Sequence, residues 1–149
     1  MIVETRNFGE IEVLDEDILF FSEGLPGFPG DRRFVLLTED DNPICYLQSV
    51  DDGDVAFVVA DLAHIMPEYS PQVAEEHLDS IGECEDEDLL LLNICTISTA
   101  MEDSTVNLKA PIVINSVEKL GKQVICNNEE YLVNAPLFGD ADAGEGELC

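Results

Sequence analysis

The sequence predicts a mainly β fold, in which an antiparallel sheet curls into a small, open, barrel-like domain with one short helix at about residues 71–81. Roughly ten short apolar runs alternate with turns that are rich in Gly, Pro, Asn and Asp, as in antiparallel β proteins. Only one segment combines the capping residues and the apolar spacing of a helix. Many short strands with frequent turns are typical of barrels and sandwiches.

The first half of the chain predicts short strands joined by polar turns. Residues 10–13 alternate acidic and aliphatic side chains, and a turn at 7–9 links them to a first strand at 2–5. Further strands are expected in four apolar runs, at residues 18–21, 34–38, 44–50 and 56–60. The spacing of Asp52 and Asp54 resembles part of a calcium loop, but the positions that follow are apolar, so we predict no metal site there.

Residues 24–30, with the sequence G-L-P-G-F-P-G, predict a rigid turn. Pro26 presets the first central position of a type II turn, and Gly27 supplies the positive φ that the second position requires. The segment lacks the glycine spacing, the Lys and the following helix of a phosphate-binding loop. It either displays Leu25 and Phe28 to a partner or tucks Phe28 under the sheet, and burial is the more common fate of an aromatic side chain.

The helix is predicted over residues 71–81. Ser70 is a suitable N-cap, Pro71 takes the first helical position, and Gly82 ends the helix. The expected buried stripe consists of Val73, Ala74, Leu78 and Ile81. His77 lies near this stripe, where a packed and hydrogen-bonded histidine is more common than a metal ligand, and no Cys or second His stands at a helical ligand spacing.

Residues 105–115, T-V-N-L-K-A-P-I-V-I-N, are predicted to form the strand around which the chain is organised. Apolar side chains stand at even spacing, so one pleated face can be buried. Because Pro111 cannot donate a hydrogen bond to a ladder, it marks a strand start, a bulge or an edge. An acidic loop at 83–88 leads into a further buried strand at 89–97.

The sheet is predicted to close with a C-terminal hairpin. Residues 116–122 form a turn or a single helical turn, and strands at 123–126 and 131–133 flank a hairpin turn at 127–128. The domain is expected to span residues 1–138. From residue 139 the composition changes to Gly, Asp, Glu and Ala, which predicts a disordered acidic tail at 139–149.

The charge of the chain restricts its partners. Against 33 acidic residues the 149-residue chain has 6 basic ones, for a formal net charge of −27. Direct binding of nucleic acid is excluded because it depends on Lys and Arg that neutralise phosphates. Two explanations of the acidic excess remain and can coexist, namely steering of a basic protein partner and adaptation to high salt. We favour salt adaptation for most of the excess, since the acids are spread along the whole chain.

The five cysteines are odd in number and widely spaced, which suits reduced thiols in the cytoplasm. Cys45, Cys95 and Cys126 lie in apolar runs and are expected to pack as small hydrophobes. Glu4 and Arg6 interrupt the first apolar residues, so no signal peptide is expected. No apolar stretch approaches the length that spans a bilayer, and we predict a cytoplasmic protein without membrane contact.

Nothing in the sequence predicts an enzyme or a cofactor. An enzyme would be expected to show a nucleophile with its base, a metal cluster or a cofactor loop, and none of these stands out. Carboxylates are too abundant in this sequence to single out a catalytic pair. An ordered series of motifs is more informative. They are F-G-E-I-E at 8–12, G-L-P-G-F at 24–28, L-Q-S at 47–49, A-F-V-V at 56–59, P-E-Y at 67–69, N-L-K-A-P-I-V-I-N at 107–115, G-K-Q at 121–123 and P-L at 136–137.

Together these motifs resemble the FliW family of flagellar assembly factors, over residues 2–138. The chain departs from the family pattern at Pro29, where an acidic residue is usual, and at Leu62, where proline is common. The resemblance implies a partner switch without catalysis, which binds flagellin in the cytoplasm and sequesters the translational repressor CsrA. The alternatives are a dedicated flagellin export chaperone without CsrA regulation and a small-molecule-binding β-barrel.

The partner-binding surface is expected on three segments that combine exposed aromatic side chains with irregular edges. They are the proline-interrupted strand, the turn with Phe28, and the loop with Glu68 and Tyr69. The candidate protein-binding residues are Phe28, Glu68, Tyr69, Asn107, Lys109 and Asn115. Packing within the fold is the alternative for each of these residues, and we favour it slightly.

Overall fold

The computed structural model describes residues 1–6, 8–25, 27–28, 30–38, 43–62, 65–82 and 85–137. The strands in this part of the chain are β1 (Ile2–Thr5), β2 (Gly9–Glu12), β3 (Ile18–Phe20), β4 (Arg33–Leu37), β5 (Ile44–Ser49), β6 (Ala56–Ala60), β7 (Leu89–Thr96), β8 (Thr105–Val106), β9 (Ile112–Asn115), β10 (Leu120–Gln123) and β11 (Ala135–Pro136). The helix α1 (Glu75–Asp79) and three 3-10 turns, Asp15–Asp17, Asp86–Asp88 and Met101–Asp103, accompany them. The predicted tail at 139–149 and the domain boundary at 138 lie outside the described residues.

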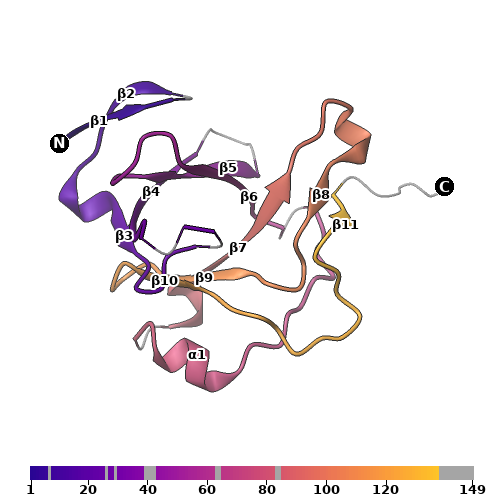
Figure 1. Ribbon diagram of the computed structural model, residues 1–149. Helices are drawn as coiled ribbons and strands as arrows, with labels where there is room; N and C mark the ends of the chain where they lie inside the picture. The colour runs from indigo at the N-terminus through magenta and orange to yellow at the C-terminus, as the bar shows by residue number, and fades with distance from the viewer. Residues whose placement is uncertain are drawn as a thin grey trace.

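Seven strands form a closed barrel, in the order β7-β6-β5-β4-β3-β10-β9 and back to β7 (Figure 1). Neighbouring strands are antiparallel except β3 and β10, which run parallel and pair at Phe20 and Leu120. The long strand β7 closes the ring, because residues 89–92 pair with β9 while Asn93 and Ile94 pair with β6. The predicted β fold with a sheet curled into a barrel is confirmed, and the ring of strand pairs is complete where the sequence predicted an open one.

The barrel interior is filled by one apolar cluster, to which nearly every barrel strand contributes. Its buried members are Leu19, Phe21, Leu25, Phe34, Cys45, Leu47, Val55, Val59, Leu92, Ile112 and Ile114. The rings of Phe21 and Phe34 meet edge to face, with centroids 5.5 Å apart. Gly121 of β10 lies against the first of these rings, and a Cβ atom at that position would stand 2.5 Å from Phe21 Cε2. The interior therefore has no room for a side chain at residue 121.

The single strand predicted at 105–115 is wrong, because β8 and β9 are separated by an irregular segment at 107–111. The Asn107 side chain breaks the strand, since its Oδ1 accepts hydrogen bonds from the backbone N–H groups of Lys109 and Ala110. Pro111 stands directly before β9, so of the three places predicted for it, a strand start, a bulge or an edge, the structure shows the strand start. All four residues of β9 are buried, and the expected one-sided burial is wrong because Val113 packs against Ile81 on the outer face of the barrel.

The predicted helix is also shorter than expected, because α1 begins at Glu75 and Ala74 is its N-cap. Residues 70–74 run without regular structure since their backbone is bonded to another part of the chain. Ser70 N–H donates to Tyr131 Oη at 2.9 Å, and Gln72 N–H donates to Asn128 Oδ1 at 2.6 Å. Asn127 N–H donates back to the Gln72 carbonyl oxygen at 2.8 Å. These long-range hydrogen bonds replace the first turn that the capping residues predict.

The C-terminal hairpin predicted around residues 127–128 is wrong. The observed hairpin joins β9 to β10 through a turn in which Lys119 has a φ of +60°. Residues 124–134 have no strand, and β11 pairs with β8 instead. The segment is held apart from the sheet because its polar groups bond to residues 70–72 and to Lys109.

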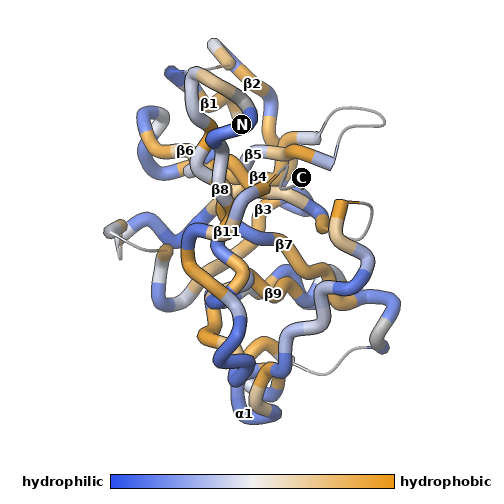
Figure 2. The backbone as a smooth tube through the Cα atoms, turned by 90° about the vertical axis from the view of Figure 1, so that its right-hand side faces the viewer, coloured by the Kyte–Doolittle hydropathy of each residue, from blue (hydrophilic) through white to orange (hydrophobic). Residues whose placement is uncertain are grey.

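The first hairpin, β1–β2, is confirmed and covers the outer face of the barrel (Figure 1). Its residues Val3 and Val13 pack against Val35 of β4 and Val50. The hairpin approaches the turn at 51–54 so closely that a Cβ atom on Gly53 would overlap the Glu4 carbonyl oxygen. Hydrophobic segments follow β3, β7 and β9 through the middle of the molecule, whereas the peripheral turns are mostly hydrophilic (Figure 2).

Candidate functional site

Three of the predicted binding residues meet outside the barrel, where residues 65–72 cross the segment at 107–110. The hydroxyl of Tyr69 donates a hydrogen bond to the Leu108 carbonyl oxygen at 2.7 Å. The Asn93 amide donates to Tyr69 Oη and to the Asn107 carbonyl oxygen, both at 2.9 Å. Burial raises the pKa of Tyr69 to about 12, so its hydroxyl remains a donor at neutral pH. We call the four residues Tyr69, Asn93, Asn107 and Leu108 the Tyr69 network.

Asn93 is the member of this network that the sequence analysis missed. It is fully buried on the outer face of β7, between residues that are almost all apolar. Its Nδ2 must face the Asn107 carbonyl, which can only accept, so the orientation of the amide is fixed. Its Oδ1 is buried without a hydrogen-bond partner among the described residues. An asparagine inside the leucine-rich run at 89–97 is the signal that could have identified it.

Lys109 and the aromatic pair Tyr69 and Tyr131 extend the Tyr69 network toward the C-terminal segment. Lys109 Nζ donates to the Asn128 carbonyl oxygen at 2.8 Å. The two tyrosine rings lie 4.9 Å apart between centroids. Tyr69, Asn107 and Lys109 therefore belong to one hydrogen-bonded layer, with the exposed Glu68 beside it in the chain.

A cavity of about 390 Å³ lies next to the Tyr69 network, between residues 61–62 and 65–69 on one side and β7 on the other. Leu62, Met66 and Pro67 line it from the loop, and the β7 side is formed by Leu89, Leu90, Leu91 and Asn93. Asp61 and Tyr69 add polar groups to the lining. The cavity thus combines an aliphatic wall with a small number of polar atoms, which is the usual composition of a binding pocket.

Phe28 lies in a different place, next to Gly27 and close to Leu25. The Phe28 N–H donates to the Leu25 carbonyl oxygen at 2.9 Å and Gly27 has a φ of +82°, as a type II turn requires. Leu25 is buried in the barrel cluster, whereas Phe28 is 41% exposed and packs edge to face on Phe57 at 5.8 Å. The aromatic ring is therefore supported from below and still accessible from outside.

Asn115 is fully buried at the end of β9. Its Nδ2 donates to the Ile81 carbonyl oxygen at 3.0 Å, and its Oδ1 accepts from the N–H groups of Val117 and Glu118, both at 3.0 Å. The side chain ties the β9–β10 turn to the segment that follows α1. The structure thus separates Phe28 and Asn115 from the Tyr69 network.

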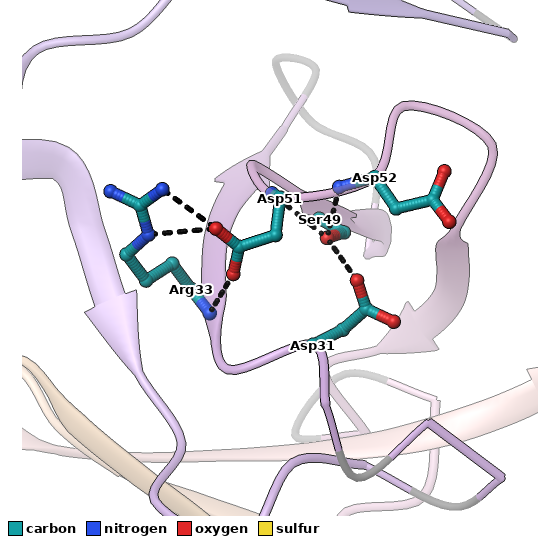
Figure 3. Close-up of polar contacts among 5 residues, drawn as sticks. All are labelled: Asp31, Arg33, Ser49, Asp51 and Asp52. Atoms are coloured by element: carbon teal, nitrogen blue, oxygen red, sulfur yellow. Dashed lines mark hydrogen bonds and ion pairs between the residues drawn. The ribbon is translucent and has the colours of Figure 1, made fainter.

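A third polar cluster surrounds Ser49 in the acidic turn after β5 (Figure 3). The buried hydroxyl of Ser49 donates to Asp31 Oδ1 at 3.1 Å and accepts the N–H groups of Asp51 and Asp52. The guanidinium of Arg33 bonds to Asp51 Oδ1 at 2.6 Å, and this hydrogen bond lowers the pKa of the Asp51 carboxyl. The cluster satisfies its own polar groups and shapes the turn.

The described cysteines fit the packing role that the sequence predicts. Cys45, Cys95 and Cys126 are buried free thiols. Burial raises the pKa of Cys95 to about 12, and burial with the nearby Asp61 charge raises the pKa of Cys45. His77 is half-buried, and its Nδ1 has no hydrogen-bond partner in the described ranges. Cys84, Cys149 and His64 lie outside the described residues.

The Tyr69 network and the cavity beside it are suited to binding. The Tyr69 hydroxyl and the Asn93 amide are engaged in hydrogen bonds within the fold and carry no charge at neutral pH, so they hold the cavity wall in place and do not transfer protons readily. In the part of the chain that the structure describes, no group of three or more His, Cys, Asp or Glu residues could hold a metal ion. None of the described helices is long and apolar enough to cross a membrane.

Comparisons with known proteins agree on one family. The sequence profile of the FliW protein family matches residues 2–137. The flagellar assembly factor FliW of Thermoanaerobacter pseudethanolicus is 39% identical over 140 residues, which cover 93% of each chain. That of Caldicellulosiruptor bescii is 36% identical over 144 residues, which cover 97% of this chain and 95% of the relative.

The fold agrees as well. The crystal structure of a flagellar assembly factor FliW superimposes with a TM-score of 0.85 at 35% sequence identity, covering 92% of this chain and 96% of the other. The family match includes every described strand, from β1 to β11. The chain therefore belongs to the FliW family of flagellar assembly factors.

Proposed function

We propose that this protein binds flagellin in the cytoplasm and sequesters the translational repressor CsrA, so that flagellin synthesis is coupled to flagellin export. Free CsrA represses the flagellin message. Flagellin that accumulates binds the protein, which then releases CsrA. The released CsrA stops translation of the flagellin message until export removes flagellin. The observation that carries this proposal is the family match over residues 2–137.

The charge of the molecule supports a basic partner. With a formal net charge of −27, the surface attracts a basic RNA-binding protein and repels the RNA that competes for it. Electrostatic attraction of this kind mainly raises the association rate, and salt screens it over a Debye length of about 8 Å at physiological ionic strength. The effect is therefore expected to depend on the salt concentration of the cell.

The predicted binding residues divide into two groups within this proposal. Phe28 and Glu68 are exposed and can contact a partner directly. Tyr69, Asn107, Lys109 and Asn115 bond within the fold, so they position the surface from which the contacts are made. The proposed mechanism is an exchange of protein partners and includes no catalytic step.

The proposal is tested by mixing the purified protein separately with flagellin and with CsrA at the salt concentration of the native cytoplasm. Analytical size exclusion is expected to show a complex with each partner. Binding of flagellin alone would support a dedicated export chaperone. Binding of neither partner would overturn the proposal.

A further inference from the structure

The cavity beside the Tyr69 network is preformed by hydrogen bonds on its loop side. Asp61 N–H donates to the Pro43 carbonyl oxygen at 2.9 Å, which anchors the start of the loop. Two turns follow, in which Met66 N–H donates to Leu62 and Tyr69 N–H donates to Met66, at 2.7 and 3.0 Å. The bond from Tyr69 Oη to Leu108 fixes the end of the loop. The fold itself therefore holds the described residues of this wall in place.

The opposite wall is made of aliphatic side chains that the fold leaves partly exposed. Leu89, Leu90 and Leu91 of β7 line the cavity and are half-buried, as is Met66 on the loop. At about 390 Å³, the cavity is at the lower end of the range of about 300–1,000 Å³ for ligand pockets. It would hold on the order of ten waters if each takes about 30 Å³. An aliphatic group that displaces this water would bury the leucine surface.

The charged groups of the cavity favour a ligand with a positive charge. Both N–H groups of the Asn93 amide are used and its Oδ1 is buried from solvent, so the Asn93 side chain offers no accessible polar atom to a ligand. Asp61 adds a carboxylate to the lining, and no described lining residue is basic. Glu68, exposed next to the lining residues Pro67 and Tyr69, adds a further negative charge nearby. A carboxylate ligand would be repelled from this site.

We infer that the cavity between β7 and the loop residues 61–62 and 65–69 receives an aliphatic side chain of a protein partner, with an adjacent Lys or Arg of that partner held near Asp61. Side chains inserted in well-packed, desolvated pockets typically dominate the binding energy at protein interfaces. The inference relies on the proposed function only for the identity of the partner. The chemistry of the site follows from Leu89, Leu91, Met66 and Asp61.

A first test uses probes that are independent of any partner. The protein, labelled at its Leu and Met methyl groups, is titrated with L-leucinamide and with N-acetyl-L-leucine, which share one side chain but carry opposite charges. Leucinamide is expected to shift the resonances of Met66, Leu89 and Leu91 in a saturable way, with N-acetyl-leucine at least about tenfold weaker. Asp61→Asn is expected to reduce this preference. Shifts spread evenly over the protein, or equal binding of the two probes, would overturn the inference.

A second test fills the cavity. Leu89→Phe and Met66→Phe place extra volume in it from opposite walls, and Val117→Phe is the matched control on the exposed β9–β10 turn. Each cavity variant is expected to weaken binding of flagellin or of CsrA about tenfold, with the melting temperature kept within a few degrees of wild type and the control unchanged. Unchanged affinity for both partners in a folded cavity variant would overturn the inference.

The two tests also separate this inference from the proposed function. If the wild-type protein binds neither flagellin nor CsrA, the proposed function fails while the leucinamide titration still decides the chemistry of the cavity. If leucinamide and a partner bind at the same time without competition, the cavity is a small-molecule site and the inferred protein anchor is wrong.

Discussion

The barrel interior and the outer layer are held together by different kinds of interaction. The interior is an apolar cluster that closes when seven strands pair around it. The outer layer, which we define as residues 65–72 and 107–111 with 124–134, combines a second apolar cluster around Leu108 with hydrogen bonds between side chains and distant backbone groups. Apolar periodicity specifies the first, whereas the second also depends on isolated polar residues. Of the residues proposed to contact partners directly, Glu68 lies on the second, and Phe28 lies outside it.

The largest loss of stability is expected from the barrel interior. Phe34 is fully buried between Phe21 and Phe57, so Phe34→Ala should destabilise the fold by about 3–5 kcal/mol. Phe28→Ala is the control, because that ring is 41% exposed and should contribute only about 1 kcal/mol through its contact with Phe57. Urea denaturation measures both. Equal losses would mean that the barrel is not the main source of stability.

A methyl group added inside the barrel is expected to cause the next largest loss of stability. Gly121→Ala places a Cβ atom 2.5 Å from Phe21, which forces the ring or strand β10 to move and should cost about 2 kcal/mol. Gly30→Ala meets no atom within 4 Å and should change stability by less than about 0.5 kcal/mol. The midpoint of urea unfolding compares the two variants. An unchanged midpoint for Gly121→Ala would contradict the tight packing at this position.

A substitution in the outer layer is expected to cause a smaller loss of stability. Tyr69→Phe removes the hydroxyl that links Asn93 to Leu108, which should cost about 1–2 kcal/mol because buried polar groups lose a partner. Tyr131→Phe is the matched control, since its hydroxyl accepts an exposed hydrogen bond from Ser70. Amide hydrogen exchange should be faster in residues 65–70 and 107–110 of the Tyr69 variant and unchanged in β4 and β5. Exchange that accelerates uniformly would contradict a separate outer layer.

A smaller, pH-dependent effect is expected at the Ser49 cluster. The hydrogen bond from Arg33 lowers the pKa of Asp51 in the folded state below its usual value of 3.8. The pair therefore stabilises the fold at pH values above 3.8, and this contribution disappears as the pH falls through the folded-state pKa. For an exposed pair it should be about 0.5 kcal/mol. The Arg33→Gln variant should be less stable than wild type at pH 7, and equally stable at pH values below the folded-state pKa of Asp51. A constant difference would contradict the linkage.

The smallest change of stability is expected at Glu68. Glu68→Lys reverses an exposed charge and should leave the melting temperature unchanged while it slows association with a basic partner. Glu16→Lys changes the net charge equally on the exposed turn at Asp15–Asp17 and serves as the control. Stopped-flow association at low salt distinguishes them. If both variants slow binding equally, the total charge of the protein matters and the position of Glu68 does not.

The same contrast explains which parts of the structure the sequence predicts. The strands at 2–5, 18–20, 56–60 and 89–96 have apolar patterns that reflect their own burial, and they were predicted with small errors at their ends. The predicted helix start at Ser70 is wrong because Tyr131 and Asn128, about sixty residues away in the chain, accept hydrogen bonds from the backbone that would form the first turn. The prediction of a single strand at 105–115 is wrong because the Asn107 side chain forms a local turn, which the spacing of apolar residues does not reveal.

The candidate site shows the same limit. Tyr69, Asn107 and Lys109 were predicted as neighbours of an irregular edge, and the structure brings them into one layer. Asn93 was missed because its role depends on the hydroxyl of Tyr69 and the carbonyl of Asn107, which lie on two other segments. Buried Asn115 could not be told from an exposed residue, since its partner Ile81 lies on a separate segment.

We propose that this FliW-family protein exchanges one protein partner for another on its acidic surface. The most direct measurement is a titration of the complex with fluorescently labelled CsrA by flagellin, followed by fluorescence anisotropy at the salt concentration of the native cytoplasm. We expect the anisotropy to fall to that of free CsrA as flagellin saturates the protein. An anisotropy that stays at the value of the complex while flagellin is bound, or a CsrA that never binds, would contradict the claim.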